Sequence, residues 1–130
     1  MLINQELLDQ VTDQAKQNPR LRMNYNLHES LDAKAQRLFN AMEPGTVIPI
    51  HRHPHTAETY IVVRGSVKIL IYDKNKNILE TVILNPENGN IGYHFPKGSW
   101  HSVEILESGT VIFEVKDGPY TPFAQDDVLK

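Results

Sequence analysis

The spacing of apolar residues changes near residue 20. Across residues 4–17 the apolar positions recur at helical intervals, which predicts an amphipathic helix with Asn4 as its N-cap. Asn18 and Pro19 should end this helix. Residues 20–28 then alternate strictly between apolar and polar side chains, which predicts a half-buried strand. The polar face of that strand carries Arg22, Asn24, Asn26 and His28.

Residues 31–42 fit two descriptions. Their apolar positions suit an amphipathic helix, and residue propensity alone favours that choice, whereas a strand would place Arg37, Phe39 and Ala41 on one face. From residue 44 onward the chain consists of turns and short apolar runs. The strands expected there cover residues 47–50, 59–63, 67–72, 78–84, 91–95, 100–106 and 110–116. Many short, evenly spaced strands predict an all-β sandwich or barrel.

The composition excludes several classes of function. A length of 130 residues fits one domain with one hydrophobic core. The net charge is -3 and there is no basic run, so the positive surface that nucleic-acid binding requires is absent. No segment approaches the roughly 20 apolar residues of a membrane span, and the first residues lack the pattern of a signal peptide. The chain has no cysteine. We therefore expect a cytoplasmic protein without a nucleic-acid or membrane partner.

The histidines are the most informative chemical feature. His51 and His53 follow an apolar run, and positions i and i+2 of a strand point to the same side. Glu58 opens the next predicted strand, and an antiparallel return would bring it beside both histidines. His101 comes after a turn at residues 96–98 that leads into another strand. These four side chains could therefore meet at one point.

Three imidazoles and one carboxylate form a nitrogen and oxygen ligand set without a soft thiolate. Such a set suits one divalent transition metal, namely Fe, Mn, Ni, Co, Cu or Zn. On an octahedral ion, four protein ligands would leave positions for water or substrate, as a working metal site requires. A His-x-His pair alone is weak evidence, because surface histidine pairs are common. Glu58 and His101, each at a junction of turn and strand, strengthen the metal hypothesis.

At these residues the sequence resembles the cupin superfamily. The first cupin motif is glycine, five residues, His-x-His, three or four residues, glutamate, six residues and glycine. The chain matches every fixed position of that motif, at Gly45, His51, His53, Glu58 and Gly65. The second motif is matched at its centre, from Pro96 to His101. Asn90 and Ile105 replace its first glycine and its last asparagine, which are turn and packing positions.

The chain resembles one subgroup more closely, the WbuC-like cupin metalloproteins that are often encoded with polysaccharide biosynthesis genes. The matching segments are residues 22–28, 36–42, 51–55 and 113–120. The resemblance implies a double-stranded β-helix (jelly-roll) barrel in which residues 35–42 form a strand, because sheet pairing can outweigh a few tenths of a kcal/mol of helix propensity per residue. The expected division is an N-terminal helical segment (1–19), a cupin barrel (20–122) and a C-terminal tail (123–130).

The resemblance also implies a function. It implies a metal held by His51, His53, Glu58 and His101, a surface-polysaccharide context and no settled reaction. The expected partner is a small molecule such as a sugar or sugar-nucleotide intermediate, converted by a metal-dependent isomerase or epimerase. Two alternatives fit the same ligand set, a non-catalytic binding module and an Fe(II) dioxygenase. Small cupins often pair, so a homodimer is a further expectation.

Six further residues are candidates for ligand binding: Arg22, Asn24, Asn26, His28, Tyr60 and Glu114. The first four could bind a sugar hydroxyl, a carboxylate or a phosphate if their strand face lines the mouth of the barrel; otherwise they form a solvated face of an edge strand. Tyr60 has the parity of Glu58 and points either toward the metal or into ordinary core. Glu114 lies in an apolar run, where a carboxylate is paired or functional unless it points outward.

Overall fold

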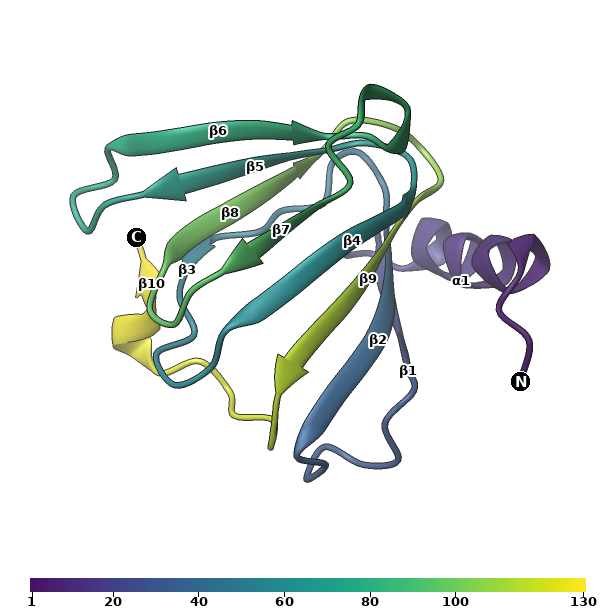
Figure 1. The fold of residues 1–130 in the computed structure, drawn as a ribbon, viewed down its shortest axis with the longest axis horizontal. Coiled ribbons are helices and arrows are strands. Elements are labelled where there is room, and N and C mark those ends of the chain that lie inside the picture. Colours follow the sequence, from purple (N-terminus) through teal and green to yellow (C-terminus); the bar gives the residue numbers. More distant parts are fainter.

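Two five-stranded antiparallel sheets form the molecule, as the computed structural model describes it for residues 1–130 (Figure 1). The first sheet has the order β1 (Arg22–Asn26), β2 (Ala35–Met42), β9 (Thr110–Asp117), β4 (Glu58–Arg64) and β7 (Gly92–Phe95). The second has the order β10 (Val128–Leu129), β3 (Ile50–His51), β8 (Trp100–Ile105), β5 (Val67–Tyr72) and β6 (Ile78–Leu84). The all-β jelly-roll expectation is therefore confirmed.

The N-terminal helix, α1 (Gln5–Gln17), covers the outer face of the first sheet near β1 and β2. It begins as predicted at Asn4, whose side chain accepts a hydrogen bond of 3.0 Å from the Leu7 amide. Its apolar face packs against the outer side of β2 and β9 through one cluster: Leu7, Leu8, Val11, Ala15, Phe39, Ala41 and Val111. None of the helices is long and apolar enough to cross a bilayer.

Strand β2 explains why its segment was ambiguous in sequence. Phe39 and Ala41 face the helix, while Met42 belongs to the cluster between the sheets, so both faces of the strand are covered. A strand covered on both faces loses the alternation that identifies a half-buried one. It pairs with β1 on one side and with β9 on the other, and this pairing outweighs the helix propensity of residues 31–42.

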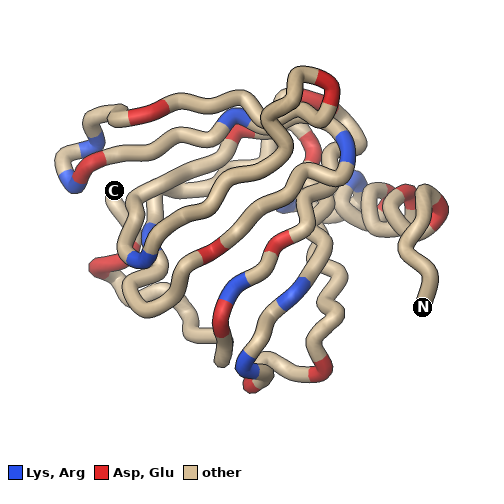
Figure 2. Tube along the Cα trace, in the orientation of Figure 1, with Lys and Arg blue, Asp and Glu red and all other residues tan.

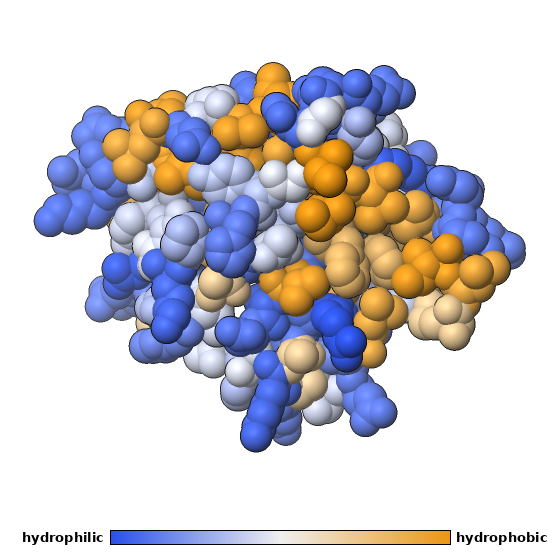
Figure 3. Space-filling view, viewed as in Figure 1, coloured by the Kyte–Doolittle hydropathy of each residue, from blue (hydrophilic) through white to orange (hydrophobic).

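The main core lies between the two sheets. Its buried members are Met42, Tyr60, Val62, Val67, Ile69, Leu84, Phe95, Val103, Ile105 and Ile112. Outside this core, apolar side chains gather in a band across the face shown in Figure 3. Ile61 and Val63 on the outer side of β4 are both more than a third exposed. An apolar band of this kind suits contact with another molecule, but the homodimer stays a prediction.

Two short 3-10 helices complete the fold, η1 (Pro86–Asn88) and η2 (Gln125–Asp127). The second precedes β10, which pairs with β3 and joins the C-terminal residues to the second sheet. Figure 2 shows basic and acidic positions interspersed along the trace.

Gly65 gives a test of the turn between β4 and β5. Its φ is +89°, and an added Cβ would overlap Thr110, which is fully buried. We predict that Gly65→Ala lowers the free energy of unfolding by about 2–5 kcal/mol, because left-handed strain of about 1–2 kcal/mol adds to overpacking of about 1–3 kcal/mol. Urea unfolding followed by circular dichroism measures the change.

Gly89 is the matched control, because it has the same φ of +89° but open space around an added Cβ. Gly89→Ala should therefore cost only the conformational part, about 1–2 kcal/mol. Equal losses for the two variants would show that contact with Thr110 does not require glycine at position 65.

Candidate metal centre

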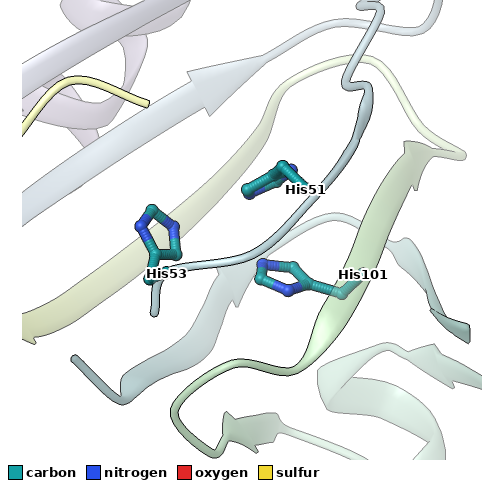
Figure 4. A group of neighbouring side chains, drawn as sticks. All are labelled: His51, His53 and His101. Atoms are coloured by element: carbon teal, nitrogen blue, oxygen red, sulfur yellow. The ribbon is translucent and has the colours of Figure 1, made fainter. Parts of the chain in front are cut away.

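Three histidines converge at one end of the barrel (Figure 4). His51 on β3 pairs directly with His101 on β8, and His53 follows in the loop after β3. One ring nitrogen from each of the three lies within 4.8 Å of the other two. The Gly98 amide donates a 2.9 Å hydrogen bond to the His53 carbonyl, so the turn before β8 is tied to the histidine loop. These three side chains could hold a metal ion.

Glu58 lies beside two of these imidazoles. It opens β4, as predicted, and its carboxylate oxygens lie 3.4 Å from His53 Nε2 and 3.5 Å from His101 Nε2. Two of the facing atoms, Glu58 Oε1 and His101 Nε2, are buried and have no hydrogen-bond partner. Buried polar atoms without partners are costly and call for an explanation. A metal ion shared by these atoms would satisfy both of them.

Backbone carbonyls orient two of the imidazoles. His51 Nδ1 lies 2.8 Å from the Pro49 carbonyl, and His101 Nδ1 lies 2.8 Å from the Ser99 carbonyl. A carbonyl only accepts, so each Nδ1 carries the proton and each Nε2 is left with a free lone pair. This orienting contact is typical of metal-ligating histidines. The ring of His101 is also stacked on Phe95, with centroids 4.2 Å apart.

Burial favours the neutral form of the His51 and His53 rings. Burial, with a smaller contribution from the neighbouring His101, lowers the pKa of His51 to about 4. Burial also lowers the pKa of His53, against the opposing effect of Glu58. For Glu58 itself, burial acts to raise the pKa, but His101 and His53 outweigh it and hold the pKa below its usual value. Neutral imidazoles and an ionised carboxylate are the forms that ligate metals.

A cavity of about 610 Å³ adjoins this cluster. Its wall includes His51, His53 and Glu58 at one side and residues of β1, β2 and β9 at the other. The volume lies within the usual range of about 300–1,000 Å³ for small-molecule sites. The cluster therefore opens onto a space that can hold a small molecule.

Comparison with known protein families gives one match to this chain. Residues 3–84, more than half of the sequence, match the family described as "Domain of unknown function (DUF6016)". The chain belongs to the DUF6016 family. The matched segment contains His51, His53 and Glu58, whereas His101 lies beyond it. No curated protein sequence matches this DUF6016 chain.

Solved structures place the DUF6016 chain in the cupin fold. The Cnp3 cupin domain of Schizosaccharomyces pombe is 10% identical, with a TM-score of 0.59 over 74% of this chain and 64% of that one. KdgF from Halomonas sp. is 16% identical, with a TM-score of 0.62 over 80% and 84% of the two chains. CapF, a capsular polysaccharide assembling protein of Staphylococcus aureus, is 18% identical, with a TM-score of 0.64 over 82% and 32%. The chain therefore has the cupin fold.

The polar strand face at residues 22–28 lines the cavity only in part. Arg22 and Asn24 are in the cavity wall, as the sequence indicated, while Asn26 and His28 are not. Asn26 pairs with Leu38, beyond the end of the cavity. His28 follows the strand, and its Nδ1 accepts a 3.2 Å hydrogen bond from the Arg37 amide. The cavity therefore takes in only the first two polar positions of this strand.

Tyr60 and Glu114 both face inward. They form a cross-strand pair between β4 and β9, both are buried, and both line the cavity. Glu114 Oε1 accepts a 2.8 Å hydrogen bond from Asn40 Nδ2. Burial and then the charge of Glu58 raise the pKa of Glu114 to about 7, and burial raises the pKa of Tyr60 well above its usual value. Glu114 is thus not the outward, solvated carboxylate that the sequence left open.

Several cavity residues were not anticipated from sequence. Asn40 and Lys116 come from inward positions of β2 and β9, and their role depends on strand register. Phe123 comes from the C-terminal segment, with its ring centroid 4.9 Å from that of His51 and 5.2 Å from that of His53. This segment is the yellow chain that runs beneath β3 and β4 in Figure 1.

The raised pKa of Glu114 predicts a pH-dependent cost to stability. Below pH 4.5 this carboxyl is protonated in both the folded and the unfolded chain. Between pH 4.5 and 7 it ionises only in the unfolded chain, so the cost to stability grows with pH and is complete above pH 7. In metal-free protein, the free energy of unfolding of the Glu114→Gln variant should therefore rise by about 3 kcal/mol relative to that of the parent as the pH goes from 4 to 8. Urea unfolding at both pH values measures this.

Glu104→Gln is the control, because Glu104 is exposed and its carboxylate lies 3.6 Å from the Lys68 ammonium group. Its effect should stay within about 0.5 kcal/mol at both pH values. A Glu114→Gln variant whose difference from the parent is the same at pH 4 and pH 8 would contradict the prediction.

Proposed function

We propose that His51, His53, Glu58 and His101 bind one divalent transition metal ion. The observation that carries this proposal is the pair of buried, unpartnered atoms, Glu58 Oε1 and His101 Nε2, which face each other across 3.5 Å. The donor set of three imidazoles and a carboxylate suits Fe, Mn, Ni, Co, Cu or Zn. The same four residues occupy the metal-ligand positions of the two cupin motifs that the chain resembles.

We propose further that the cavity binds a sugar or sugar-nucleotide intermediate of surface polysaccharide biosynthesis. The resemblance to WbuC-like cupins and the fold shared with CapF support this context. A bound metal would act as a Lewis acid toward a ligand oxygen. The chain itself supplies Arg22, Asn24 and Asn40 to contact polar groups of the ligand.

Glu114 makes isomerisation or epimerisation the reaction that this cavity supports best. A carboxyl with a pKa of about 7 can accept or donate a proton near neutrality, and Asn40 holds it in place. Conversion of sugar nucleotides by the metal-loaded protein would establish an enzyme. Binding without product change would establish the alternative, a metal-dependent binding module.

Metal content tests the ligand set. We predict about one equivalent of metal in the parent, measured by mass spectrometry after purification without a tag. A four-ligand site is worth about 10–16 kcal/mol, so the loss of one ligand in His53→Ala should weaken affinity at least about a hundredfold. Competition with a chelator measures that loss.

His55→Ala is the matched control, since His55 is exposed and lies outside the histidine cluster. It should keep the parent affinity. Equal metal loss in both variants, or no metal in the parent even after reconstitution, would reject the site.

The lowered histidine pKa values predict that metal binding persists in acid. Protons compete with a metal only below a ligand's own pKa, and that of His51 is about 4. Proton competition at His51 and His53 should therefore cost little affinity between pH 7.5 and 6, whereas a solvent-exposed histidine pair with a pKa near 6.5 would already lose affinity there. Metal titration across this range, with the His55→Ala variant in parallel, measures the profile. A tenfold loss of affinity between these pH values would contradict the prediction.

A further inference from the structure

The cavity beside the histidines is rich in cations. Its wall contains three basic side chains, Arg20, Arg22 and Lys116, and two carboxylates, Glu58 and Glu114. The whole chain has a net charge of -3, so basic residues are concentrated here against the overall balance. A metal at the proposed site would make the cavity still more positive. Clefts lined by charge of one sign concentrate ligands of the opposite sign.

These three cations are not used within the fold. Three basic side chains outside the cavity form salt bridges: Arg52 with Asp127, Arg64 with Asp9 and Lys68 with Glu104. No salt bridge involves Arg20, Arg22 or Lys116. The ammonium group of Lys116 lies 5.8 Å from the centroid of the Tyr120 ring, which leaves its hydrogen-bond donors free. Basic groups that line a cavity without acidic partners are available to a ligand.

A polar row runs beside these cations across the first sheet. Asn24 on β1 pairs with Asn40 on β2, and the Asn40 side chain donates to Glu114 on β9. Asn40 Oδ1 is buried and has no hydrogen-bond partner. Asn40 itself is in the cavity wall, so its amide group lies beside the space that a ligand would occupy.

We propose that the cavity binds a small anion that also carries hydroxyl groups. Arg22 and Lys116 bind its carboxylate or phosphate, and Asn24, Asn40 and Glu114 bind its hydroxyls. The inference rests on the proposed function only in using the same cavity, since these residues do not ligate the metal. It narrows the ligand class from sugar derivatives in general to acidic ones, such as sugar acids or sugar phosphates.

Three probes test the charge requirement by isothermal titration of the metal-loaded protein. Gluconate and sorbitol have the same carbon chain and differ in the carboxylate, and glucose 6-phosphate carries a phosphate instead. We expect both anions to bind at least about tenfold more tightly than sorbitol, the usual worth of a charge-assisted contact. The tighter of the two anions identifies which acidic group the cavity prefers.

A matched pair of variants tests the location. Arg22→Gln should weaken binding of the preferred anion by about 10- to 100-fold and leave sorbitol binding unchanged. Arg37→Gln removes the same charge from an exposed position of β2 outside the cavity, and it should behave as the parent. Circular dichroism and metal content, measured on both variants, show that fold and metal site are intact.

The outcomes separate this inference from the metal proposal. Equal binding of gluconate and sorbitol, no binding of any probe, or equal effects of Arg22→Gln and Arg37→Gln would overturn the inference. A protein that binds no metal but still prefers the anions through Arg22 would retain the inference and reject the metal site. A protein that binds metal but shows no preference for the anions would retain the metal site and reject the inference.

Discussion

The pairing of β3 with β8 is the contact on which the site depends. It places His51 opposite His101, although the two are far apart in sequence. The hydrogen bond between Gly98 and His53 then joins the loops that follow and precede these strands. Because backbone contacts bring both motifs together, the convergence of the imidazoles follows from the sheet itself. A site built on paired strands is held more precisely than one built on loops.

The same local device orients two of the histidines. In each, Nδ1 meets the carbonyl two residues earlier in the chain, that of Pro49 for His51 and that of Ser99 for His101. These two hydrogen bonds point the Nε2 atoms of both rings toward the same region and fix the tautomer of each ring. Burial works in the same direction, because it disfavours the imidazolium form of His51. Geometry and protonation state are therefore set together by the fold.

Sequence patterns predicted strands and motifs better than they predicted which residues line the cavity. The strands at residues 67–72 and 78–84 were predicted with their observed bounds, and the motif spacing located the histidine cluster. Residues 31–42 were ambiguous because burial of β2 on both faces removes the alternation that marks a strand. Asn26 had the expected parity, but strand register decides where the cavity ends. Asn40 shares that dependence on register, so sequence alone did not reveal it.

The C-terminal segment carried no periodic signal, yet it forms part of the cavity wall beside the histidines. Its place is fixed by the contact of Arg52 with Asp127 at 3.2 Å and by the pairing of β10 with β3, which join distant parts of the chain. Phe123 thereby packs on His51 and His53. Phe123 and the cations Arg20 and Arg22 line the same cavity, so a ligand bound there can contact both the ring and the cations. The C-terminal segment thereby adds an apolar wall to a cavity whose basic side chains can attract an anion.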